Sequence, residues 1–171
     1  PEESLVILFC GRLSREKNLF HLLDAYHQLD HEHKSLLFIG DGDLRHSLQD
    51  YADQLGADSV YFCGFQNRNQ ILKYYAISDF FVLPSLRETW GIVVNEAMCS
   101  GLPVIVSDQV GAGVDLVING RNGYKVATDG DDLFRSIKQI ADLPEAERHL
   151  MGMRSFNIVK EWSNRNLAES L

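Results

Sequence analysis

The sequence has little cysteine, no long hydrophobic run and no excess of positive charge. Its three cysteines, Cys10, Cys63 and Cys99, are widely spaced in apolar sequence, and no CxxC pair suggests a metal site. We therefore expect free, buried thiols in a reducing compartment. No apolar run approaches the length of a membrane span, and no charged-then-apolar segment at the amino end suggests a signal peptide.

The charge balance restricts the partners. Lys and Arg number 16 and Asp and Glu 24, which gives a formal net charge of -8. This argues against nucleic acid as the main partner, because phosphate backbones are bound by excess cations. An anionic ligand must therefore be held by local cations. The length of 171 residues and the 45% hydrophobic share fit one soluble globular domain.

Apolar runs of strand length alternate with helical patterns along the chain. The predicted strands cover 5–10, 35–39, 60–63, 80–83 and 104–106, with a weaker one at 123–126. Helical patterns begin near Asn18, Asp43, Asn67 and Gly91, and two more cover about 131–141 and 145–159. The pattern predicts an α/β fold, a Rossmann-like doubly wound parallel sheet flanked by helices. Ligands of such sheets bind beyond the carboxyl ends of the strands.

Two glutamates bracket the turn that follows the fourth predicted strand. The run is Glu88-Thr89-Trp90-Gly91-Ile92-Val93-Val94-Asn95-Glu96, and Gly91 marks a sharp turn into a helix. Unpaired amides and the helix dipole at such a junction favour an anion such as a diphosphate. Glu96, about one turn inside the helix, can accept hydrogen bonds from vicinal hydroxyls. The run therefore predicts a sugar-nucleotide site.

The loop after the first strand carries two cations. Its sequence is Gly11-Arg12-Leu13-Ser14-Arg15-Glu16-Lys17-Asn18. Arg12 offers a planar fork for phosphate oxygens and Lys17 a mobile point charge, so together they can neutralise much of a diphosphate. Asn18 is a candidate N-cap for the next helix.

Three other patterns have weaker functional interpretations. Gly40-Asp41-Gly42 is half of a dinucleotide fingerprint, but it follows the second strand and position 45 is Arg where a third glycine is required. We interpret it as a turn or a close backbone approach to a ligand. A zinc site at His27, His31 and His33 is disfavoured, because no cysteine or compact set of acids completes a ligand shell. A glycosidase pair is disfavoured too, because one glutamate is in a loop and the other on a helix.

Taken together, the motifs resemble the carboxyl-terminal half of a retaining GT-B glycosyltransferase of family 4. In chain order they are Gly11-Arg12-Leu13 with Glu16-Lys17-Asn18, Gly40-Asp41-Gly42, Phe62-Cys63-Gly64-Phe65, Pro84-Ser85, Glu88-Thr89-Trp90-Gly91, Glu96-Ala97-Met98, Gly101-Leu102-Pro103-Val104-Ile105, Asn119-Gly120 and Asn122-Gly123-Tyr124. The departures are modest: Asn18 replaces a common glycine, Thr89 and Trp90 form a variable pair, and Asp115 replaces a common glutamate in the predicted turn 113–117.

The resemblance implies roles for these residues. Arg12 and Lys17 would hold the donor diphosphate, Glu88 the donor sugar and Glu96 the ribose hydroxyls. Arg12, Lys17 and Glu88 are thus the predicted catalytic residues. The predicted substrate-binding residues are Gly11, Gly40, Gly42, Phe62, Gly64, Phe65, Thr89, Trp90, Gly91, Ile92, Val93 and Glu96. The backbone from Thr89 to Val93 would contact the sugar and distal phosphate, and the segments around Phe62 and Gly40 would border the base.

The resemblance also implies what surrounds this domain. Residues 1–171 would be the donor domain, and the amino-terminal acceptor domain would be absent, so the chain should bind a nucleoside-diphosphate sugar without transferring it. We expect no metal or other cofactor, no nucleic acid partner, and a cytoplasmic location, with any association at the inner face of a membrane carried by the missing half. Three alternatives remain open: a nucleotide-sugar epimerase of the same architecture, an NAD-binding dehydrogenase domain, and a non-catalytic nucleotide-binding module. The base and the sugar are not specified.

Overall fold

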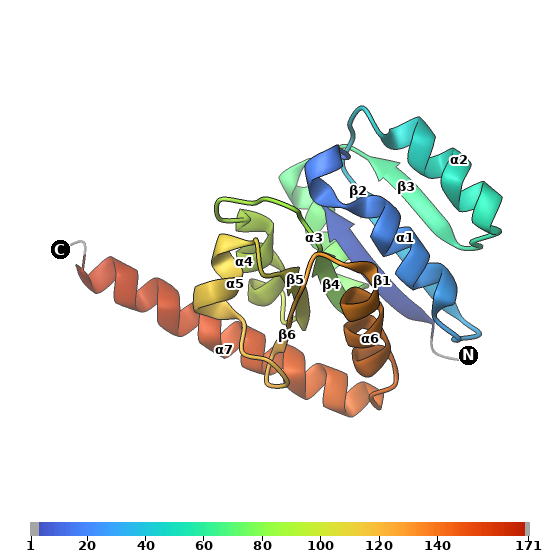
Figure 1. The fold of residues 1–171 in the computed structure, drawn as a ribbon. Coiled ribbons are helices and arrows are strands. Elements are labelled where there is room, and N and C mark those ends of the chain that lie inside the picture. Colours follow the sequence, from blue (N-terminus) through green and yellow to red (C-terminus); the bar gives the residue numbers. More distant parts are fainter. Residues whose placement is uncertain (1–3, 170–171) are drawn as a thin grey trace.

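The computed structural model describes residues 4–169 and consists of one parallel sheet with helices on both faces (Figure 1). All neighbouring strands run parallel in the order β3-β2-β1-β4-β5-β6. The strands are β1 (Leu5–Cys10), β2 (Lys34–Ile39), β3 (Val60–Gly64), β4 (Phe80–Leu83), β5 (Val104–Ser107) and β6 (Gly123–Val126). The predicted Rossmann-like fold class is confirmed, and each predicted strand lies within a residue or so of its observed bounds.

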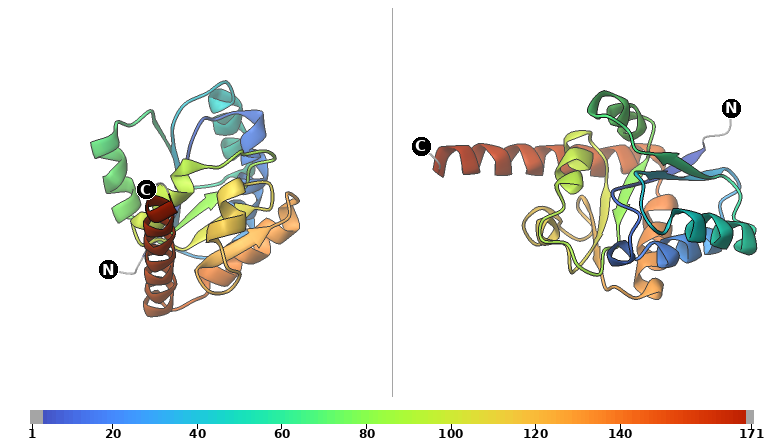
Figure 2. Two further views of the ribbon diagram at one scale, coloured as in Figure 1. Left: turned by 90° about the vertical axis from the view of Figure 1, so that its left-hand side faces the viewer. Right: turned by 90° about the horizontal axis from the view of Figure 1, so that it is seen from above.

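Helices form a layer on each side of the sheet (Figure 2). One layer holds α1 (Leu19–Gln28), α2 (Arg45–Leu55) and α6 (Gly130–Ala141). The other holds α3 (Arg68–Ala76), α4 (Ile92–Cys99) and α7 (Glu145–Glu169), with α5 (Gly111–Leu116) against α4 and α7. The last turns of α7 extend away from the sheet (Figure 1). Within residues 4–169 no helix is both long and apolar enough to cross a membrane.

The strands form the core because helices cover them on both faces. Every residue of β4 and of β5 is buried, which is why these strands appear in the sequence as continuous apolar runs without polar alternation. The cysteines are free, as predicted, but only Cys10 is buried. The expectation of three buried thiols is wrong for Cys99, which is exposed at the end of α4.

Two helices differ from the prediction. The predicted turn 113–117 falls on α5, a short helix that begins at Gly111 and includes Asp115. Its Gly-Ala-Gly start has low helix propensity, so tertiary contacts against α4 and α7 determine this helix. The second difference is α7, which continues to Glu169 although the apolar pattern weakens after 159.

The order of the strands places a topological switch point between β1 and β4. The chain moves outward from β1 through β2 to β3, then returns to the other side of β1 with β4 and moves outward again through β5 to β6. At such a topological switch point the loops after the two central strands diverge and leave room for a ligand. The loop from Gly11 to Asn18 follows β1, and the loop from Pro84 to Gly91 follows β4.

Candidate functional site

Two contacts join the loops on either side of the switch point. Lys17 Nζ forms an ion pair with Glu88 Oε2, and the two side chains are 16% and 22% exposed. The backbone amide of Leu86 also donates to the carbonyl of Glu16 at 2.7 Å. Lys17 and Glu88 were predicted from separate motifs, and the fold brings them together at the carboxyl ends of β1 and β4. An anion that binds there meets a lysine whose charge a carboxylate already partly compensates.

Asn18 does not act as the predicted side-chain cap of α1. It has φ 58° and ψ 37°, in the left-handed region, and makes no side-chain capping bond. Its Nδ2 instead donates to the carbonyl of Thr128 at 3.0 Å, in the connection between β6 and α6. The cap prediction is therefore wrong, because an N-cap side chain needs an extended backbone. Asparagine, like glycine, adopts a left-handed backbone readily, which explains why it can stand where the family that this sequence resembles commonly has glycine.

A pocket of about 420 Å³ lies beside these loops, at the carboxyl ends of β1 and β2. Its lining residues are Cys10, Gly11, Arg12, Ile39, Gly40, Asp41, Phe65, Gln66 and Ile71. Arg12 is exposed at this pocket, and Phe65 is 82% exposed. Four predicted site residues thus line one pocket. The lining residues that sequence reasoning did not select are mostly apolar or amide side chains with no charge to mark them.

The Gly40-Asp41-Gly42 turn packs against the loop after β1. A Cβ atom on Gly40 would clash with the carbonyl oxygen of Gly11, and one on Gly42 with that of Leu13. The amide of Gly11 donates to the carbonyl of Ile39 at 2.9 Å, which holds the two turns in register. These two glycines therefore allow a close backbone approach to the loop after β1.

The segment after β3 contributes unequally to the pocket. The ring of Phe62 stacks on Phe38 with centroids 4.9 Å apart, so it packs against the core. Gly64 accepts a hydrogen bond from the amide of Gly40 at 2.8 Å. Arg45, which sequence analysis noted only as a missing glycine, donates from Nη2 to the carbonyl of Phe62 at 3.1 Å. Its Nη1 lies 3.5 Å from Asp41 Oδ2, so Arg45 ties α2 to the pocket rim.

The turn from Glu88 to Gly91 is fixed by the first two residues of α5. The amide of Gly111 donates to the carbonyl of Glu88 at 3.1 Å, and that of Ala112 to the carbonyl of Trp90 at 2.9 Å. Gly91 has φ 85°, which L side chains rarely adopt, and leads directly into α4. Thr89 and Ile92 are exposed, whereas Trp90 and Val93 are partly buried.

Glu96 lies on the second turn of α4, exposed to solvent, and accepts a hydrogen bond from the hydroxyl of Tyr75 at 3.2 Å. Sequence reasoning missed Tyr75, because nothing in α3 distinguishes it from an ordinary core tyrosine. Its side chain is 1% exposed, and burial, with Cys10 and Glu96 nearby, raises the pKa of Tyr75 far above its usual range. Tyr75 is therefore a neutral donor that orients the carboxylate.

Cys10 lines the pocket but is chemically passive. Burial raises the pKa of its thiol to about 11, with the carboxylate of Glu96 adding to the effect and the Tyr75 hydroxyl opposing it. The thiol is therefore protonated at neutral pH and is a poor nucleophile. In the part of the chain that the structure describes, no group of three or more His, Cys, Asp or Glu side chains is arranged to hold a metal ion.

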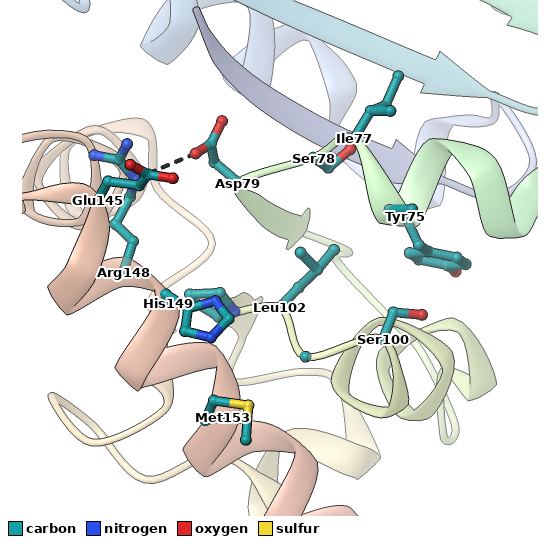
Figure 3. Close-up of a pocket in the computed structure, with 13 residues that line it drawn as sticks. Tyr75, Ile77, Ser78, Asp79, Ser100, Leu102, Glu145, Arg148, His149 and Met153 are labelled. Atoms are coloured by element: carbon teal, nitrogen blue, oxygen red, sulfur yellow. Dashed lines mark ion pairs between the residues drawn. The ribbon is translucent and has the colours of Figure 1, made fainter. Parts of the chain in front are cut away.

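A second pocket, of about 430 Å³, opens at the opposite edge, where β4 and β5 begin (Figure 3). None of the predicted site residues lines it. Arg148 on α7 faces Asp79 across it, with Nε and Oδ1 3.3 Å apart, and also donates to the carbonyls of Ala141 and Leu143. Asp79 in turn accepts from the amide of Val6 at 2.7 Å. These contacts join α7 to the residue that precedes β4.

The chain matches a known protein family over most of its length. Residues 1–153 match the family described as glycosyl transferases group 1. An uncharacterized glycosyltransferase of Methanocaldococcus jannaschii is 38% identical over 133 residues, which are 77% of this chain and 34% of that protein.

Solved structures share the fold over nearly the whole chain. Sucrose-phosphate synthase from Thermosynechococcus elongatus superposes with a TM-score of 0.86 at 27% identity, over 99% of this chain and 45% of the other. Anabaena HepE in complex with UDP and glucose gives a TM-score of 0.84 at 24% identity, over 98% and 48%. The chain thus corresponds to about half or less of each of these proteins, and its fold is that of GT-B carboxyl-terminal domains.

Proposed function

Because the chain belongs to the family of glycosyl transferases group 1, we propose that it is the donor-binding domain of a retaining glycosyltransferase of family 4. It binds a nucleoside-diphosphate sugar, and the acceptor is held by a separate amino-terminal domain. The proposal is supported by the Lys17–Glu88 pair, which joins a phosphate-binding cation to a sugar-directed carboxylate across the switch point. In the related fold of Anabaena HepE, the protein holds UDP and glucose.

The ligand spans the pocket and the switch point between β1 and β4. The base lies in the pocket that Phe65 and Gly40 line, with the exposed Phe65 ring available for stacking. The ribose hydroxyls donate to Glu96, which Tyr75 orients. Arg12 and Lys17 hold the diphosphate at the carboxyl end of β1. The sugar and distal phosphate then lie over the turn from Glu88 and the first amides of α4, where the helix dipole favours negative charge.

In the proposed reaction the bond between the anomeric carbon and the diphosphate oxygen breaks while the acceptor oxygen bonds to that carbon on the same face. The acceptor's proton passes to the departing phosphate. Arg12, Lys17 and the start of α4 stabilise the negative charge that develops on the diphosphate. These protein cations do the work of a metal ion, and neither Glu88 nor Glu96 is a nucleophile.

Calorimetry on the 171-residue chain with UDP, GDP and ADP tests the proposal. We expect one of them to bind and none of their sugar derivatives to be turned over by this domain alone. In a thermal-shift panel, a ligand at 100 times its dissociation constant should stabilise by about 2.7 kcal/mol. No heat and no stabilisation with any of the three would refute donor binding. Robust transfer by this chain alone would refute the need for a second domain.

A further inference from the structure

A stacked pair of tryptophans joins α7 to the turn that precedes α4. The ring centroids of Trp90 and Trp162 lie 5.1 Å apart and their planes differ by 27°. Both side chains are partly buried against the core. Trp162 lies beyond residues 1–153, the part of the chain that matches the family. The family match therefore does not cover this contact, which the last part of α7 makes.

Two hydrogen bonds also hold Trp90 in place. Its Nε1 donates to Asn95 Oδ1 on α4 at 2.9 Å, and Asn95 is buried. Its carbonyl accepts from the amide of Ala112 on α5 at 2.9 Å. In the sequence Trp90 lies two residues after Glu88 and directly before Gly91, which has a left-handed backbone. A movement of the Trp90 ring therefore moves the backbone that carries Glu88 and the entry to α4.

We propose that Trp162 is a positioning residue for the turn from Glu88 to Gly91, acting on it through the Trp90 ring. The inference rests on the proposed function, since that turn is where the distal phosphate and the sugar are received. A helix outside the ligand site thus determines how well the turn is preformed. By linkage, a ligand that orders the turn must also change the tryptophan stack.

The chain makes this coupling directly observable, because Trp90 and Trp162 are its only two tryptophans. All tryptophan fluorescence, and any exciton signal between indoles in far-ultraviolet circular dichroism, arises from this pair. We expect UDP, GDP or ADP, whichever binds, to change both signals at saturation. The corresponding monophosphate, which lacks the distal phosphate, should occupy the base pocket with a much smaller spectral change.

Three variants test the positioning role. Trp162→Leu should raise the dissociation constant of the nucleoside diphosphate about two- to twelve-fold, the range expected when an aromatic pair is lost. Binding of the monophosphate should change less than about two-fold, which general destabilisation would not produce. Trp162→Phe, which keeps an aromatic face, should restore most of the affinity. Phe156→Leu is the matched control, since it removes another aromatic side chain from α7, one that is 37% exposed.

The outcomes separate this inference from the function on which it rests. If the unmodified chain binds no nucleotide, the proposed function fails and the inference fails with it. If the unmodified chain binds normally, the inference alone is overturned by any of three results: Trp162→Leu binds the diphosphate as tightly as the unmodified chain, it loses monophosphate and diphosphate equally, or the tryptophan signals stay constant at saturation.

Discussion

Removing the carboxylate of Glu88 should have opposite effects on two related ligands. Among the three charged side chains assigned to the diphosphate and sugar, Arg12 and Lys17 each contribute one positive charge and Glu88 one negative charge. The Lys17–Glu88 pair is only 16% and 22% exposed, so the two charges are partly enclosed. Glu88→Gln keeps the shape of the side chain and releases Lys17 from its ion pair.

The magnitude follows from the exposure of the pair. A fully enclosed pair at an effective dielectric near 20 is worth roughly 4 kcal/mol. Solvent screening at a partly exposed site reduces this to about 1 kcal/mol, the upper end for surface pairs. The nucleoside diphosphate should therefore bind Glu88→Gln about five-fold more tightly than the unmodified chain. The nucleotide sugar should instead lose affinity, because its hydroxyls lose a charged acceptor worth about 1.5–3 kcal/mol, which is more than the release of Lys17 contributes.

Titration calorimetry with both ligands measures the two effects. Asp53→Asn serves as the control, since it removes one exposed carboxylate near the end of α2, which leads to the opposite edge of the sheet. The gain in diphosphate affinity should shrink as salt is added. If Glu88→Gln weakens diphosphate binding, or the control matches its gain, the pairing of Lys17 with the phosphate has been misassigned.

Three further predictions concern the other polar groups of the site. Glu96→Gln should weaken nucleoside diphosphate binding by about 1.5–3 kcal/mol while inorganic pyrophosphate binding stays unchanged; equal losses in calorimetry would mean that Glu96 does not contact the ribose. Tyr75→Phe should weaken binding of the nucleoside diphosphate by about 0.5–1.5 kcal/mol, because the hydroxyl that orients Glu96 is lost. In a double-mutant cycle this effect should largely vanish when Glu96 is already Gln, and full additivity of the two substitutions would show that Tyr75 acts elsewhere. In the full-length enzyme, Lys17→Ala should lower kcat roughly 10²–10³-fold and Arg12→Ala should act alike, while EDTA leaves the unmutated enzyme active; abolition by chelator with a silent Lys17→Ala would instead indicate a metal.

The sequence predicts the strands well because burial on both faces makes each of them a continuous apolar run. It also marks the turns after β1 and β4, which the structure brings together, because they carry charged residues at strand ends. Local patterns fail where distant contacts decide the conformation. The start of α5 at Gly111 has turn-like composition, and the side chain of Asn18 donates to the carbonyl of Thr128, far along the chain, and does not cap α1.

Pairings between residues far apart in the chain could not be derived from the sequence. Lys17 and Glu88 are 71 residues apart, and no local spacing indicates that they meet. The same holds for Tyr75 with Glu96, where a buried hydroxyl is selected by its partner and not by its own neighbours in sequence. Trp162 was missed for a related reason, since a single aromatic on a long helix gives no sign of the turn against which it packs.

The contacts between the loops after β1 and β4 have a consequence for folding. The first half of the chain builds β1, β2 and β3 with the cations, and the second half builds β4, β5 and β6 with both glutamates. Neither half contains the whole site, which is complete only when β1 pairs with β4 at Ile7 and Leu8. Because β4 begins at Phe80, this pairing cannot form on a nascent chain before that residue emerges. Tight binding of the nucleoside diphosphate should therefore appear during refolding only when the two halves have docked, which makes the ligand a probe of that docking.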